Sequence, residues 1–254
     1  GLVYSGPHFY VGNPLYKSPR IGYRHNKDYD CIDHMMINTD HLPKTLFRPA
    51  LDLDKYERRL PQWQGRPHSS YYRYANRAMI APTGERTLIP TILPRGASHI
   101  DGVVSIAFSD QRLIPALVGT LSSIPIDFFV KSTGKGHARI DILNLLPIHN
   151  QGHTVGRALR LNCLTSHYAD LWSELYTPAF NTDSHTKPDL RLPDWTHLGP
   201  TWDWHTPLRS PFARRQALVE LDALAAIALG LTADELCLIY RIQFPILHQY
   251  ENDT

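Results

Sequence analysis

The chain has few cysteines and no long apolar run. Its three cysteines, Cys31, Cys163 and Cys237, are odd in number and far apart, so we expect no disulfide framework and a reducing, cytoplasmic compartment. No apolar stretch approaches the roughly 18 residues that a membrane span requires. The first residues also lack the basic and then apolar pattern of a signal peptide. The sequence therefore predicts a cytoplasmic protein without a membrane partner.

Several signatures of catalytic and cofactor sites are missing too. The sequence contains no G-x-x-x-x-G-K-[ST] phosphate loop, no G-x-G-x-x-G after a predicted strand and no G-x-S-x-G nucleophile motif. It also has no H-E-x-x-H and no C-x-x-C, two common zinc-binding patterns. These absences argue against a nucleoside triphosphate site and against hydrolases that use these motifs. We expect no cofactor and no metal in this chain.

What remains is typical of a globular protein. The 254 residues are 43% hydrophobic and 20% charged, which is enough apolar material for a sizeable core. The 20 prolines predict short strands and long irregular connections. Because the chain starts with Gly1 rather than with Met, we expect a piece of a longer protein.

Charge is spread unevenly along the chain. The net charge is only +2, but residues 1–139 hold 18 Lys and Arg against 11 Asp and Glu, whereas residues 140–254 hold 8 against 13. Such asymmetry indicates a polyanion partner for the first part. The alternative is a chance scatter of charges over a solvated surface.

The first half of the sequence predicts short strands around a buried helix. Residues 52–60 form a candidate short helix with Asp52 as its N-cap. Strands are predicted within YYRYANRAMI (residues 71–80), RTLIPTILP (86–94) and VVSIAF (103–108). A buried helix is expected from near Asp110, because its apolar residues keep helical spacing. These residues are Leu113, Ala116, Leu117 and Leu121.

The second half predicts mainly helices. A helix is expected over residues 155–176, followed by a long loop over residues 177–212 that its tryptophans pin to the core or offer to bases. These tryptophans are Trp195, Trp202 and Trp204. A further helix should run from about residue 212 to 229 and end at Gly230. Thr232 and Glu235 then form a capping box for a last helix, which Pro245 should stop or kink.

Together these elements predict an α+β fold. Residues 1–150 would form a short-stranded mixed β region with a buried helix. Residues 151–254 would form a mainly helical C-terminal part with the long loop over residues 177–212.

A basic, glycine-containing loop is the strongest functional candidate. In VKSTGKGHARI, residues 130–140, three bases surround Gly134 and Gly136, and no acid is present. The bases are Lys131, Lys135 and Arg139. Glycine lets backbone N–H groups approach an anion, and lysine adds charge. Since the nucleoside triphosphate motif is absent, a nucleic-acid backbone fits better. A mobile surface turn is the alternative.

Two other stretches suggest catalysis. NPLY, residues 13–16, differs by one residue from the N-P-P-[YF] motif of amino-methyltransferases, in which an aromatic ring stacks on a flipped base. An Asn-Pro turn is the alternative. Residues 25–41 hold histidines, a cysteine and aspartates without a defined zinc spacing. A metal-dependent nuclease there would lack the compact carboxylate and lysine arrangement of that class.

Three stretches, taken in order, resemble the C-terminal half of large adenine-N6 DNA methyltransferases. They are YRYANRAMIAPTGERTLIPTILPRGASH (72–99), SSIPIDFFVKSTGKGHARIDILNLLPI (122–148) and RRQALVELDALAAIALGLTADELCLIYRIQFPIL (214–247). The related enzymes are type IIG-like methylases and those of phage-defence islands of the BREX and DISARM kind. Similarity is best over about residues 70–150 and 210–250. The opening SGPHFYVGNPLYKSPR also resembles the segment that leads into this region.

The resemblance implies a target-recognition region that embraces double-stranded DNA. In the family, methyl transfer belongs to an upstream domain that holds S-adenosylmethionine and the N-P-P-Y motif, and this chain departs from that motif at Leu15. On matching positions the resemblance points to Arg86 in the strand region and to four residues of the loop. These four are Lys131, Ser132, Thr133 and Lys135.

Our leading hypothesis is therefore a DNA-binding piece of a restriction-modification or phage-defence methyltransferase, which alone would not be catalytic. Loop bases would neutralise phosphates, Thr133 and His137 could reach phosphate or a base edge, and three arginines would extend the basic surface. These arginines are Arg73, Arg77 and Arg86. Expected partners are DNA, the upstream domain and other defence subunits. The alternatives are a catalytic piece, either a methyltransferase remnant or a nuclease, and a protein-interaction module.

Overall fold

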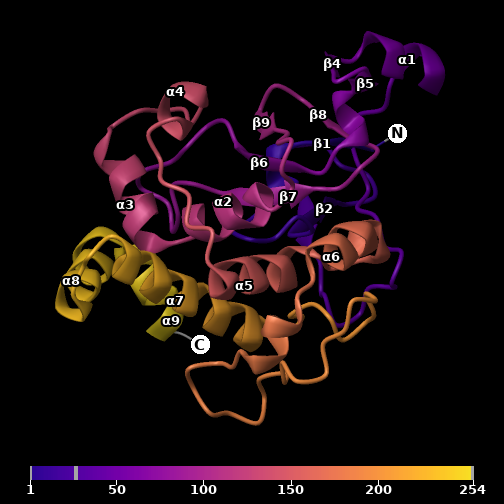
Figure 1. The fold of residues 1–254 in the computed structure, drawn as a ribbon. Helices are drawn as coiled ribbons and strands as arrows, with labels where there is room; N and C mark the ends of the chain where they lie inside the picture. Colours follow the sequence, from indigo (N-terminus) through magenta and orange to yellow (C-terminus); the bar gives the residue numbers. More distant parts are fainter. Residues whose placement is uncertain (1, 26–27, 253–254) are drawn as a thin grey trace.

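The computed structural model describes residues 2–25 and 28–252 (Figure 1). Short strands occur in the N-terminal half, and helices dominate the C-terminal half. This arrangement confirms the predicted α+β class.

A three-stranded antiparallel sheet forms the centre of the N-terminal half. Its middle strand β6 (Arg73–Arg77) pairs with β7 (Pro90–Leu93) on one side and with β9 (Val103–Ile106) on the other. A separate pair joins β1 (Leu2–Tyr4) and β8 (Ala97–His99) in parallel. The β region is thus mixed, as predicted, and each predicted strand is present but shorter than its apolar run.

Smaller elements surround these strands. They are the hairpin of β2 (Lys17–Pro19) and β3 (Tyr29–Cys31), helix α1 (Leu53–Arg59), the hairpin of β4 (Gln62–Trp63) and β5 (Arg66–Pro67), and 3-10 turns at Gly6–His8 and His68–Ser70. Helix α1 confirms the short helix predicted over residues 52–60, although the Asp52 side chain makes no cap hydrogen bond.

The predicted buried helix is in fact two helices. The first, α2 (Leu113–Leu121), is bent by 71° relative to α3 (Ile124–Ser132). The break occurs because Ser123 has an extended backbone and Pro125 lacks the N–H that would continue the helix. Within residues 2–25 and 28–252, no single helix is long and apolar enough to cross a membrane, and this bent pair meets those criteria only together.

The predicted helix over residues 155–176 is also interrupted. It is divided into α5 (Gly152–Asn162), a 3-10 turn (Ser166–Tyr168) and α6 (Ala169–Leu175). Carbonyls at the break accept hydrogen bonds from side chains far along the chain. The Cys163 carbonyl accepts from Trp202 Nε1 at 2.7 Å, and the Leu164 carbonyl accepts from Arg209 Nη2 at 3.0 Å. The break is therefore set by tertiary contacts rather than by local sequence.

The C-terminal helices match their sequence signals. They are α7 (Pro211–Ala228), α8 (Ala233–Gln243) and α9 (Pro245–Asn252). After α7, Gly230 has a left-handed φ of 72°. The backbone N–H groups of Thr232 and Glu235 each donate to the other's side chain, which confirms the capping box of α8. Pro245 separates α8 from α9, as predicted.

The loop over residues 177–212 is fastened by its tryptophans. It contains one 3-10 turn, at Pro178–Thr182. Trp195 is buried, and the Arg160 guanidinium lies 4.5 Å from its ring centre. The Arg209 guanidinium lies 3.4 Å from the ring centre of Trp204. Since the rings pack against the chain itself, they hold the loop to the core.

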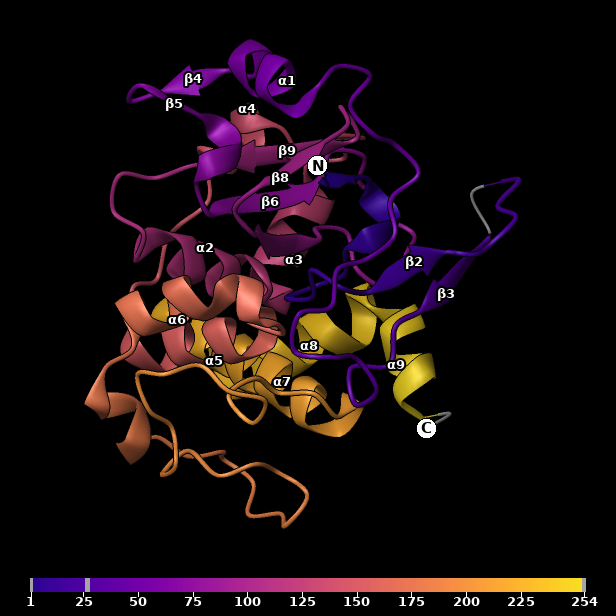
Figure 2. The ribbon, with the colours of Figure 1, turned by 90° about the vertical axis from the view of Figure 1, so that its right-hand side faces the viewer.

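The largest hydrophobic core combines both halves of the chain. It includes Tyr74 of β6, Leu117 of α2, Leu159 of α5 and Trp195. Helix α5 packs on α2 (Figure 2), and Gly119 permits this approach because a Cβ there would lie 2.6 Å from Thr154 Cγ2. The expected boundary near residue 150 falls between two helices, α4 (Ile140–Leu143) and α5, and the packing of this core crosses it.

Candidate nucleic-acid interface

The basic loop is fixed to the sheet region at its C-terminal end. After α3 ends at Ser132, Gly134 takes a φ of 66°, a left-handed conformation that glycine adopts at low cost. The Gly136 carbonyl accepts from Ile80 N at 3.1 Å, and Ala138 N donates to the Ala78 carbonyl at 2.8 Å. The next residue, Arg139, precedes the short helix α4 (Ile140–Leu143). The loop is thus a defined surface feature.

Two loop bases and a histidine are exposed together. Lys135 Nζ pairs with Asp141, and Arg139 Nη2 lies 3.3 Å from Asp101 Oδ2. With His137, these bases line a shallow concavity of about 490 Å³. The nearby lysine lowers the pKa of the Asp141 carboxyl through its hydrogen bond. Such solvent-exposed pairs contribute little stability, so a phosphate can replace the carboxylates at small cost.

The start of the loop faces the protein itself. Lys131 is half-buried; its Nζ donates to the Gln243 carbonyl at the end of α8 and lies 5.1 Å from the Phe244 ring centre. Ser132 Oγ and Thr133 Oγ1 each donate to a carbonyl of their own helix at 2.7 Å. These three residues therefore serve first to hold the end of α3 in place.

The three arginines expected to extend a basic surface have structural contacts instead. Arg73, 1% exposed, donates to Ser105 Oγ at 3.1 Å and to the Ala97 carbonyl. Burial lowers its pKa to about 10. Half-buried Arg77 donates to the Gly6 carbonyl at 2.8 Å and to the Phe9 carbonyl. Both side chains fasten β6 to its neighbours.

Arg86 forms a buried ion pair. Its Nε donates to Asp127 Oδ2 at 2.8 Å, and both side chains are almost completely buried. The same carboxylate accepts the backbone N–H groups of Thr87 and Leu88. The expectation that Arg73 and Arg86 lie on an exposed basic surface is therefore wrong. The alternation of polar and apolar residues along a strand does not reveal which arginines find hydrogen-bond acceptors inside the fold.

A cavity lies beside the NPLY segment. It measures about 740 Å³ and is lined by residues of the N-terminal loop, the segment after β3, α7 and α9. Asn13 and Tyr16 lie in its wall, but Asn13 Oδ1 accepts from Leu15 N at 3.0 Å, which is an Asn-Pro turn. No glycine among the described residues lines this cavity. The wall therefore does not form a glycine-lined cofactor cradle.

The His and Asp residues of 25–41 do not gather around one point. Among the described residues, no group of three or more His, Cys, Asp or Glu is placed to hold a metal ion. Asp30 pairs with Arg20 at 2.6 Å, and buried His34 bonds through Nε2 to the Leu15 carbonyl at 3.0 Å. Burial, followed by the charge of Arg214, lowers the pKa of His34 to about 3. These side chains are used within the fold.

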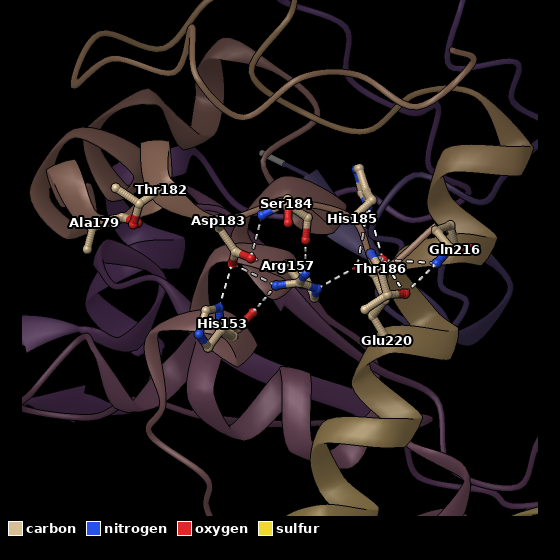
Figure 3. Close-up of polar contacts among 10 residues, drawn as sticks. All are labelled: His153, Arg157, Ala179, Thr182, Asp183, Ser184, His185, Thr186, Gln216 and Glu220. Atoms are coloured by element: carbon tan, nitrogen blue, oxygen red, sulfur yellow. Dashed lines mark hydrogen bonds and ion pairs between the residues drawn. The ribbon is translucent and has the colours of Figure 1, made fainter. Parts of the chain in front are cut away.

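A buried charge network connects α5, α7 and the long loop (Figure 3). Arg157 Nη1 lies 2.7 Å from Asp183 Oδ2, and its Nε lies 2.6 Å from Glu220 Oε2. Burial alone would raise the pKa of Glu220, but hydrogen bonds from His185 and Gln216 and the charge of Arg157 lower it to about 2. Because these charges compensate one another, we assign the network a structural role. Sequence reasoning did not find it, since its members are far apart in the chain.

Comparison of this chain with protein-family models, with curated proteins and with solved structures gave no match.

Proposed function

We propose that this chain is the DNA target-recognition part of a large adenine-N6 DNA methyltransferase from a restriction-modification or phage-defence system, acting in the cytoplasm. Its partner would be double-stranded DNA, and the methyl transfer would occur in an upstream domain of the parent protein.

The contacts among the three family-like segments support this proposal. Arg86 of the first segment pairs with Asp127 of the second. Ile124 N of the second donates to Asp222 Oδ1 of the third at 2.7 Å. The segments therefore build one scaffold, and the basic loop is an exposed part of its second segment.

The observation that carries the proposal is the exposed loop itself. Lys135, His137 and Arg139 surround a shallow concavity whose backbone is fixed by hydrogen bonds to residues 78–80. A fixed, glycine-containing loop can bring both its amides and its cations to phosphate oxygens without a large ordering cost. Phosphate contacts of this kind position a duplex, while base readout is left to other side chains.

S-adenosylmethionine is assigned to the upstream domain and not to this chain. Asn13 is engaged in its own turn, and the described cavity wall beside it contains no glycine. We therefore derive no methyl-transfer step from these residues.

Fluorescence anisotropy with a mixed-sequence duplex at several salt concentrations tests the proposal. The log of the affinity should fall linearly with the log of the salt concentration, and the Lys135→Ala/Arg139→Ala variant should flatten the slope by about 2, one for each lost phosphate contact. The Arg191→Ala variant is the control, because Arg191 is exposed and paired with Asp189 on the long loop. No binding by the wild-type chain at low salt would contradict the proposal.

A further inference from the structure

A short basic arm stands off the body of the protein. It comprises Arg48 to Pro67, with α1 followed by the hairpin of β4 and β5. In both views it extends beyond the sheet (Figures 1 and 2). Helix α1 has no buried residue. An amphipathic surface helix normally buries one face, so the core does not explain why this helix is present.

The base of the arm is nevertheless well anchored. Tyr71 Oη donates to the Trp63 carbonyl at 2.8 Å, and the two rings meet edge to face with centres 4.9 Å apart. His68 N donates to the Pro61 carbonyl at 2.9 Å. The arm is thus held in a defined position at its base, while α1 and the hairpin tip remain in solvent.

Most of the exposed cations on the arm have no carboxylate partner within the described ranges. Its bases are Arg48, Lys55, Arg58, Arg59 and Arg66, and all five are exposed. Lys55 pairs with Asp52 at 3.2 Å. Within the described ranges, Arg48, Arg59 and Arg66 form no ion pair, whereas exposed arginines elsewhere commonly do. Examples of the paired kind are Arg20, Arg95, Arg112, Arg139 and Arg191.

The tip of the hairpin has an unusual backbone. Gln64 and Gly65 have φ values of 48° and 74°, the paired positive angles of a two-residue hairpin turn whose twist matches its strands. Gln64 is the one non-glycine residue with positive φ among those described. Glutamine costs more than glycine or asparagine here, and such retained strain often marks a functional position. Its amide can donate to a phosphate or to a base edge.

The arm and the basic loop lie at the same end of the molecule. Both views place α1, β4, β5 and α4, which follows the loop directly, toward the same end of the molecule (Figures 1 and 2). The long loop that contains Arg191 lies at the opposite end. The arm and the basic loop are therefore two separate segments at the same end of the molecule.

We propose that the arm is a second DNA-binding element, so that a duplex lies across this end of the molecule between the arm and the basic loop. Arg48, Arg59 and Arg66 contact phosphates, and the narrow two-stranded tip has the dimensions of a ribbon that a DNA groove admits. This inference rests on the proposed function and adds a contact that the sequence analysis did not include.

The salt dependence of duplex binding separates the two ideas. Changing Arg48, Arg59 and Arg66 to Ala should flatten the slope by about 2 to 3, independently of the change produced by Lys135→Ala/Arg139→Ala. The matched control changes Arg95, Arg112 and Arg191 to Ala, which removes the same charge from paired positions. Thermal unfolding checks that the arm variant stays folded, as expected for exposed side chains.

Two outcomes overturn the inference in different ways. If the loop variant weakens binding and the arm variant behaves as its control does, the arm proposal is wrong and the proposed function stands. If the wild-type chain binds no duplex, both fail. A photo-crosslinking residue at Gln64 gives an independent reading: it should label duplex DNA, while the same residue at exposed Leu190 should not. Equal labelling at both positions counts against the arm.

Discussion

At the scale of single residues, burial decides which arginines are available to a ligand. The first half of the chain is rich in bases, but Arg73 and Arg86 are buried and donate their hydrogen bonds to acceptors inside the fold. A count of formal charge along the sequence therefore overstates the basic surface. Lys135 and Arg139 differ from them because their partners, Asp141 and Asp101, are themselves exposed.

The Arg86–Asp127 pair should be one of the most sensitive points of the fold. Asp127→Ala leaves a guanidinium buried without its counter-charge and also removes the acceptor for Thr87 N and Leu88 N. We expect a loss of about 3–5 kcal/mol in the free energy of unfolding, measured by urea denaturation. Asp110→Ala, which breaks an exposed pair with Arg112, should cost less than about 1 kcal/mol. Equal effects of the two changes would contradict this assignment.

At the scale of elements, the sequence predicted the presence of helices and strands more reliably than the interruptions within the helices. Local signals sufficed for β6, β7 and β9 and for the Thr232 capping box, but not for β8. The break after α5 was missed because its carbonyls are satisfied by Trp202 and Arg209, about forty residues away along the chain.

The two loop glycines should respond differently to alanine. Gly134 has a φ of 66°, whereas Gly136 is outside the left-handed region, and neither has a neighbouring atom within 4 Å of an added Cβ. Gly134→Ala should therefore destabilise the loop by about 1–2 kcal/mol through backbone strain alone, and we expect weaker duplex binding. Gly136→Ala is the matched control for backbone strain and should leave the stability nearly unchanged. Anisotropy and urea denaturation measure both effects.

At the scale of the whole molecule, the fold joins the two predicted halves through one core and places the basic loop and the arm at one end. The α+β class and the helical C-terminal part were predictable from periodicity, capping and proline positions. The pinning of the long loop by tryptophans was one of two readings that the sequence left open. The role of the arm could not be predicted, because its sequence looks like any charged stretch on a solvated surface. Only the structure shows that these bases are exposed and that Arg48, Arg59 and Arg66 form no ion pair within the described ranges. The positions of Arg73 and Arg86 were also beyond prediction, since their acceptors come from other elements.

Hydrogen exchange of the chain with and without a duplex tests the central claim most directly, because it reports every segment at once. The account predicts slower exchange at residues 133–141 and 48–67 when DNA is present, and no change over residues 183–198 of the long loop. Protection confined to the long loop, or no protection anywhere at low salt, would contradict the claim that DNA lies across the end formed by the basic loop and the arm.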